Sequence, residues 1–156
     1  MSPALKYKVV SIDEVPVKDP TPGKNPQRRV VLVVDDERVI ADTLSVILSR
    51  SGFSVLTAYN GESAIELARA VPPDLLLSDV MLGPGMDGTQ LAIEIIGACP
   101  ECKVLLFSGH AATADLLVKA RASGHDFTLM TKPVHPTDLL ARIKESFATA
   151  GAYATV

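Results

Sequence analysis

The chain has 156 residues, a length that suits one domain of about 100–150 residues and leaves no space for a second domain of ordinary size. Its net charge of −3 excludes the basic excess typical of nucleic-acid binding, and no apolar stretch reaches the ~20 residues of a membrane helix. The N-terminus lacks the pattern of a signal peptide, so we expect a cytoplasmic protein that has protein partners, with no nucleic acid and no membrane.

Residues 1–28 are rich in proline and charge, which is typical of a flexible linker or tail. The alternation of apolar and polar residues at positions 5–9 leaves a short added strand as the alternative. A regular pattern begins near residue 29. We therefore expect one domain over residues 29–149, followed by a C-terminal tail at 150–156.

Short apolar runs rich in β-forming residues alternate with amphipathic stretches of helical length. The runs that predict strands are Val30–Val34, Ser54–Ala58, Leu75–Ser78, Val104–Phe107 and Phe127–Met130. The first run is apolar at every position, as expected of a strand that is buried on both faces.

Between and after these runs, apolar residues recur at the spacing of one helix face. The predicted buried faces comprise Ile40, Leu44, Ile47 and Leu48; Ala64, Leu67, Ala68 and Val71; Leu91 and Ile95; Leu116, Leu117 and Ala120; and Leu139, Ile143 and Phe147. Strand and helix units in alternation require right-handed crossovers. The pattern therefore predicts an α/β fold, with a doubly wound five-stranded parallel sheet covered by helices on both faces.

Polar side chains follow four of the predicted strands, at the edge where open parallel sheets form their sites. These residues are Asp35 and Asp36, Asp79, Ser108 with Gly109, and Lys132. Each alone is explained by a helix cap or a turn. Together they predict one site.

Neighbouring carboxylates at this edge repel one another by roughly 4 kcal/mol per pair at about 4 Å, so a cation is needed. Mg²⁺ prefers such hard oxygen ligands, and the loops lack cysteine and histidine at zinc spacing. An aspartate can itself accept a phosphoryl group, while Lys132 and Ser108 can each donate a hydrogen bond to a phosphoryl oxygen. The residues therefore predict magnesium-dependent phosphoryl chemistry.

Four motifs carry a resemblance to a known family: Val33–Glu37, Leu77–Asp79, Leu106–Gly109 and Thr131–Pro133. In this order they resemble the receiver domains of bacterial two-component response regulators, over about residues 29–148. The resemblance implies a flavodoxin-like sheet of strand order 2-1-3-4-5. It also implies a single-domain regulator similar to those of chemotaxis, with no separate output domain.

The resemblance also implies a role for each matching residue. Asp79 corresponds to the phosphoacceptor and a metal ligand, Asp36 to a direct Mg²⁺ ligand, and Asp35 to a carboxylate that acts through a metal-bound water. The backbone carbonyl of Met81 corresponds to a further ligand, and Mn²⁺ is the alternative ion.

On the phosphate side, Ser108 corresponds to the switch hydroxyl, Gly109 accompanies it, and Lys132 pairs with phosphate. The bond from Lys132 to Pro133 is commonly cis in the family.

The implied phosphoryl donor is the phosphohistidine of a partner kinase or phosphotransfer protein, and the downstream protein target is unknown. The chain would catalyse only its own phosphorylation and dephosphorylation, so we do not expect an enzyme in the usual sense. The family also allows a homodimer through the face formed by the fourth helix, the fifth strand and the fifth helix.

Two features depart from the family pattern: the residue at position 129, and the span from Gly124 to Lys132, which is one residue longer than usual. Leu129 stands where the family usually has a switch aromatic, and Phe127 lies two residues earlier. We treat both as candidate modulators, together with His110, which follows Ser108 by two positions. The departure at Leu129 supports an alternative function, a pseudo-receiver that binds a partner constitutively.

A third alternative is an aspartate-nucleophile phosphohydrolase of the haloacid-dehalogenase kind. Those enzymes carry a DxD motif after their first strand, whereas this chain has the adjacent acids Asp35 and Asp36 there. Cys99 and Cys102 have the spacing of a metal or redox pair, but the sequence offers no second pair. We interpret these two thiols as structural or incidental.

Overall fold

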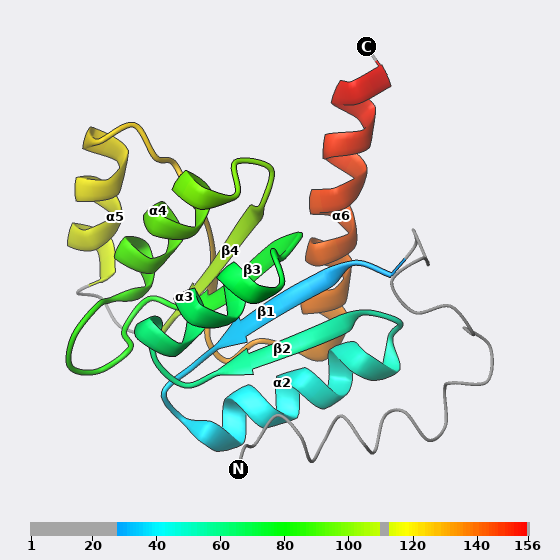
Figure 1. Cartoon of the computed structure of the whole chain (residues 1–156), viewed down its shortest axis with the longest axis horizontal. Helices are drawn as coiled ribbons and strands as arrows, with labels where there is room; N and C mark the ends of the chain where they lie inside the picture. The colour runs from blue at the N-terminus through cyan, green and yellow to red at the C-terminus, as the bar shows by residue number, and fades with distance from the viewer. Residues whose placement is uncertain (1–27, 110–112, 156) are drawn as a thin grey trace.

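The computed structural model describes residues 28–109 and 113–155 and contains five strands and five helices. The strands are β1 (Val30–Val34), β2 (Ser54–Ala58), β3 (Leu75–Asp79), β4 (Lys103–Ser108) and β5 (Thr128–Thr131). They form one parallel sheet in the order β2-β1-β3-β4-β5 (Figure 1). The predicted fold class and strand order are confirmed.

Helices cover both faces of this sheet (Figure 1). They are α2 (Arg38–Arg50), α3 (Gly61–Ala70), α4 (Gly88–Ala98), α5 (Thr113–Ala122) and α6 (Pro136–Thr155). The last helix continues past the predicted domain boundary at residue 149. The predicted N-terminal linker lies almost wholly outside the described residues.

Two buried clusters hold the layers together. On one face, alternate side chains of the central strands pack with α2 and α6, as Leu48 and Ile143 show. On the other face, α3 and α4 pack through residues such as Ala64 and Ile95. The strands β1, β2, β3 and β4 therefore contribute side chains to both clusters, which explains why β1 is apolar at every position and why β3 begins with three leucines.

Local capping sets two helix ends, the start of α4 beside the carboxyl end of the sheet and the end of α2 at the opposite edge. Asp87 accepts hydrogen bonds from the Thr89 and Gln90 amides, and the Gln90 side chain accepts one from the Asp87 amide, so α4 begins with a capping box. Gly52, with a φ of +101°, reverses the chain after α2. These caps fix where the two helices meet the sheet.

One predicted core residue is placed differently. Val71 is 42% exposed, because α3 ends at Ala70 and Val71 already has extended backbone before the two prolines. The prediction that Val71 belongs to the buried helix face is therefore wrong. Within the described ranges, no helix combines the length and hydropathy that a membrane crossing requires.

Candidate functional site

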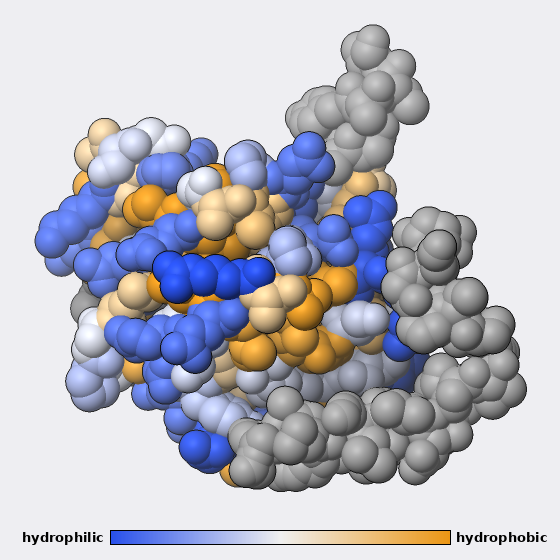
Figure 2. Space-filling view, in the orientation of Figure 1, coloured by the Kyte–Doolittle hydropathy of each residue, from blue (hydrophilic) through white to orange (hydrophobic). Residues whose placement is uncertain are grey.

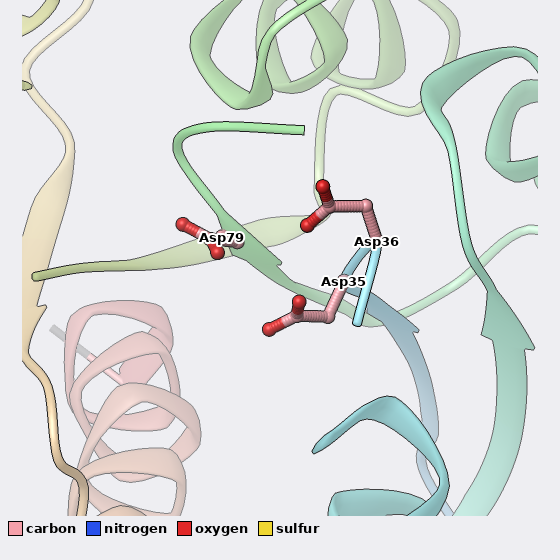
Figure 3. Close-up of side chains that lie close together, drawn as sticks. All are labelled: Asp35, Asp36 and Asp79. Carbon is pink, nitrogen blue, oxygen red and sulfur yellow. The ribbon is translucent and has the colours of Figure 1, made fainter. Parts of the chain in front are cut away.

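Three carboxylates meet at the carboxyl end of the sheet. Asp35 and Asp36 follow β1, and Asp79 ends β3, the strand beside it. Each offers an oxygen that lies within 4.8 Å of those of the other two (Figure 3). The predicted convergence of these acids from separate strand ends is therefore present in the structure.

The three carboxylates differ in burial. Asp35 is fully buried, the Asp79 side chain retains 10% of its accessible surface, and Asp36 is exposed. Asp79 can therefore still be reached from solvent, whereas Asp35 can act only on groups that already lie inside the site. Asp36 closes the cluster on its outer side.

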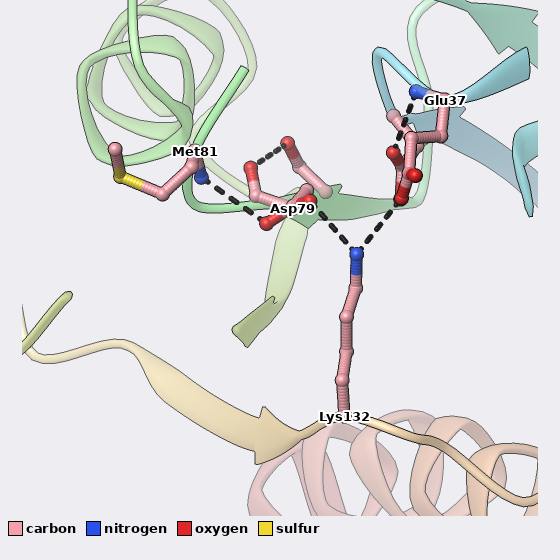
Figure 4. Close-up of polar contacts among 6 residues, drawn as sticks. Glu37, Asp79, Met81 and Lys132 are labelled. Atoms are coloured by element: carbon pink, nitrogen blue, oxygen red, sulfur yellow. Dashed lines mark hydrogen bonds and ion pairs between the residues drawn. The ribbon is translucent and has the colours of Figure 1, made fainter. Parts of the chain in front are cut away.

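Lys132 provides the positive charge of the site. Its Nζ donates to Asp79 Oδ2 at 2.8 Å and to Asp35 Oδ2 at 3.3 Å (Figure 4). Lys132 comes directly after β5, and its position is fixed by the pairing of β5 with β4, because the Lys132 amide donates to the Ser108 carbonyl at the end of β4. A residue 53 positions further along the chain is thus joined directly to Asp79.

Backbone groups hold the remaining carboxylate oxygens. The Met81 amide donates to Asp79 Oδ1 at 3.1 Å, and the Glu37 amide donates to Asp35 Oδ1 at 2.9 Å (Figure 4). Both oxygens of each of these two acids are therefore engaged. Asp36 forms no such bond in the part of the chain that the structure describes, so its oxygens remain available to a cation.

Ser108 and Gly109 lie beside the lysine, as predicted. Ser108 is buried at the end of β4, opposite Thr131 of β5. A Cβ placed on Gly109 would lie 3.6 Å from the Cβ of Lys132, so this glycine contacts the lysine stem. The bond between Lys132 and Pro133 is cis, as the family resemblance implies.

Burial and charge move two pKa values in the site. Burial raises the pKa of Asp35 above its usual value, although the Glu37 amide and the Lys132 ammonium oppose this shift. Burial also opposes the charge of Lys132, but the hydrogen bond to Asp79 and the charges of Asp35 and Asp79 outweigh it, so the lysine pKa is raised. The site therefore keeps the lysine charged and makes Asp35 harder to ionise than an exposed carboxyl.

The residues present suit a divalent cation. With all acids ionised, three carboxylates and one ammonium leave a formal charge of −2 in a partly buried space. Carboxylate oxygens at this separation are the hard ligands that Mg²⁺ prefers. Because Lys132 neutralises only one of the three acids, the cluster retains the charge that such an ion would offset.

The candidate modulators lie farther from the acids or outside the described residues. Leu129 lies in β5 opposite Leu106, and Phe127 packs on the α3 and α4 side of the core and stacks on His125 with ring centroids 5.8 Å apart. His110 falls outside the described residues. Their modulating roles stay predictions.

Sequence reasoning missed three groups that shape the site. The Glu37 amide has no sequence signature, since any residue other than proline supplies the same donor. The Phe107 ring lies 5.7 Å from Lys132 Nζ, within the range of a cation–π contact. Gly88, at the start of α4, is so close to β3 that a Cβ there would stand 2.2 Å from the Asp79 carbonyl oxygen.

The two cysteines lie at the other end of α4 and take no part in this cluster. Both are free thiols that pack in the same core, and burial raises the pKa of Cys102 to about 12. A protonated buried thiol is a weak nucleophile and a weak metal ligand. The geometry is consistent with their interpretation as structural residues.

Comparison with known proteins shows which family the chain resembles. Residues 31–144 match the model of the response regulator receiver domain family. A CheY-like receiver domain protein from Methanospirillum hungatei is 27% identical, with a TM-score of 0.71 over 81% of this chain and 98% of that chain.

Two further solved structures are similar. The signal receiver domain of an HD domain-containing protein from Pseudomonas fluorescens is 26% identical, with a TM-score of 0.73 over 81% of this chain and 99% of that one. The receiver domain DrrB, described as BeF3 activated, is 29% identical, with a TM-score of 0.65 over 78% of this chain and 98% of that one.

Proposed function

Because the chain belongs to the response regulator receiver domain family, we propose that Asp79 accepts a phosphoryl group from the phosphohistidine of a partner histidine kinase or phosphotransfer protein. In this reaction a carboxylate oxygen of Asp79 forms a bond to phosphorus, and the bond between phosphorus and the imidazole nitrogen breaks. The imidazole leaves with the electron pair. The observation that carries the proposal is the placement of Asp79 beside Lys132 and two further carboxylates.

Lys132 binds and orients the phosphoryl group in this proposal. In the structure its Nζ lies 2.8 Å from Asp79 Oδ2, so an ammonium already stands beside the oxygen atoms of the acceptor. A charge-assisted hydrogen bond to a phosphoryl oxygen can replace the present bond to the carboxylate without moving the lysine backbone. Ser108, which is buried at the end of β4, would donate to another phosphoryl oxygen.

The acids would hold Mg²⁺, with Mn²⁺ as the alternative ion. Asp36, Asp79 and the backbone carbonyl of Met81 would bind the ion directly, and Asp35 would bind it through a water. The bound ion supplies positive charge that offsets the phosphoryl oxygens. The formal charge of −2 supports this assignment, as do the exposed oxygens of Asp36, which have no hydrogen-bond partner among residues 28–109 and 113–155.

The signal would pass to other proteins through contacts, and the protein would turn over only its own acyl phosphate. Ser108, Gly109 and Lys132 lie at the ends of β4 and β5, so a change at the phosphoryl group reaches the face formed by α5, β5 and α6 first. This face is the proposed surface for a downstream target or for a second copy of the chain.

A constitutive protein-binding module is the second candidate. The observation that favours it is Leu129, an aliphatic side chain in β5 where receiver domains usually carry the switch aromatic. In this case the acids would bind a cation, but phosphorylation would leave the partner surface unchanged.

Beryllofluoride mimics a phosphoryl group on a carboxylate. Amide chemical shifts recorded by NMR with Mg²⁺ and beryllofluoride distinguish the phosphoacceptor from the constitutive binding module. The proposed function predicts shifts at Asp79 and Lys132 that spread to β5 and α6, and their loss in Asp79→Asn. Shifts confined to the acids would favour the constitutive module. Unchanged spectra with Mg²⁺ and beryllofluoride would contradict phosphoacceptance itself.

A further inference from the structure

An open groove of about 520 Å³ runs between α3 and α4, on the side of the molecule away from β5. A volume of this order accommodates a few side chains. Its lining residues are Glu62, Gly85, Met86, Gln90, Ile93 and Glu94.

The middle of the groove is apolar. Met86 and Ile93 are both half-buried, and Met86 packs against the buried cluster beneath α3 and α4. Figure 2 shows apolar surface between hydrophilic side chains over these two helices. A ligand with only charged groups would leave this apolar surface in contact with water.

The two sides of the groove are acidic. Glu62 begins the first turn of α3, and Glu94 lies in the middle of α4; both side chains are exposed. Neither carboxylate forms an ion pair with any residue in ranges 28–109 and 113–155. The groove therefore carries negative charge that no ion pair among the described residues neutralises.

We propose that this groove binds an arginine-bearing apolar helix of a partner protein. The aliphatic stem of an arginine can lie over Met86 and Ile93 while its guanidinium pairs with Glu62 and Glu94. Neighbouring apolar side chains of the helix would cover the rest of the apolar surface, as in other helix-in-groove complexes. Charge complementarity selects this occupant over an acidic or purely apolar one.

The groove is connected to the phosphoacceptor by a short loop. Residues 80–87 join Asp79 to α4; the Met81 amide binds the Asp79 carboxylate near one end of the loop, and Met86 lines the groove near the other. Met86 is pressed against α3, since a Cβ on Gly61 would stand 2.8 Å from the Met86 sulfur. Phosphorylation would therefore alter helix binding, a consequence that rests on the proposed function.

Fluorescence anisotropy with the full chain tests the binding. The probe is a short fluorescein-labelled helical peptide with arginine and leucine on one face, and the control peptide has glutamine in place of arginine. We expect the double variant Glu62→Gln, Glu94→Gln to bind the arginine peptide about fivefold more weakly, since two exposed ion pairs are lost and each of them is weak. We expect Glu101→Gln, an exposed acid outside the groove, to bind normally.

The apolar part of the groove has its own test. Ile93→Gln should weaken binding of both peptides. In the NMR spectrum of the natural chain, addition of the arginine peptide should shift amide signals only in α3, α4 and residues 81–87. Equal binding of the two peptides, or normal binding by the double variant, would overturn the proposal. If the peptide binds more tightly after residues 1–27 are removed, the occupant of the groove is this chain's own N-terminus instead. If the natural chain self-associates and the double variant does not, the occupant is a second copy of the chain.

The effect of phosphorylation on helix binding is measured by repeating the peptide anisotropy titration with Mg²⁺ and beryllofluoride. A change in peptide affinity of threefold or more supports it, and an unchanged affinity overturns it while the groove assignment stands. If beryllofluoride produces no spectral change at Asp79 even without peptide, the proposed phosphoacceptor function fails, and the peptide titrations still decide on the groove.

Discussion

Replacing Asp35 with asparagine should stabilise the metal-free protein at pH 7. At an effective dielectric of 20, repulsion from Asp79, whose nearest oxygen lies within 4.8 Å, amounts to at least about 3.5 kcal/mol, and attraction to Lys132 at 3.3 Å amounts to about 5 kcal/mol. The net electrostatic attraction on the Asp35 carboxylate is therefore small. Burying this fully enclosed charge costs several kcal/mol, which the attraction does not offset. Asparagine keeps an oxygen for the Glu37 amide and removes the charge, so we expect a gain of about 1–3 kcal/mol.

The pH dependence has a defined sign. The pKa of Asp35 is higher in the folded chain than its ordinary value of 3.8, so its contribution to stability is complete below pH 3.8 and is lost as the pH rises through the folded pKa. Asparagine cannot ionise. The stability advantage of Asp35→Asn should therefore be small near pH 4 and should increase toward pH 7.

Urea unfolding monitored by circular dichroism, with a chelator present and at several pH values, measures this difference. Asp126→Asn serves as the control, because its carboxylate is exposed and forms only a surface ion pair. Adding Mg²⁺ should stabilise the natural chain more than the Asp35→Asn variant and so narrow the gap. Equal or lower stability of Asp35→Asn at pH 7 without metal would refute the argument from burial.

Three further substitutions test other parts of the account. Lys132→Ala should retain Mg²⁺ binding in a calorimetric titration but lose the beryllofluoride response of β5; an intact response would remove the lysine from the switch. Gly88→Ala should lower the unfolding temperature by several degrees and weaken Mg²⁺ binding, because its Cβ would meet the Asp79 carbonyl oxygen at 2.2 Å; normal values for both would contradict that contact. Asp87→Ala should cost about 1 kcal/mol in urea unfolding through loss of the α4 cap, and a neutral result would show that the cap adds no stability.

The sequence predicted the sheet well because each strand carries a short run rich in apolar residues. Val30–Val34 and Ser54–Ala58 have the bounds expected of them, and Leu75–Asp79 differs only by including the acid itself. The fifth strand is one residue later than predicted, since Phe127 is apolar but packs beside the strand rather than within it. An apolar side chain does not distinguish these two positions.

The sequence predicted which residues meet in the candidate site, but it did not predict which hydrogen bonds they form. Strand topology alone brings Asp35, Asp79 and Lys132 to one edge, because parallel strands end on the same side. Which oxygen each donor binds depends on backbone direction, as the amides of Glu37 and Met81 show. Such donors are present at almost every position, so only the coordinates reveal which of them are used.

Mass spectrometry after incubation with acetyl phosphate and Mg²⁺ tests the central claim most directly. Borohydride reduction converts the acyl phosphate to homoserine, which a peptide map can locate. The account predicts one phosphoryl group on the natural chain, homoserine at position 79, and no incorporation in Asp79→Asn, with circular dichroism confirming that the variant is folded. Full incorporation in Asp79→Asn, or none in the natural chain, would contradict it.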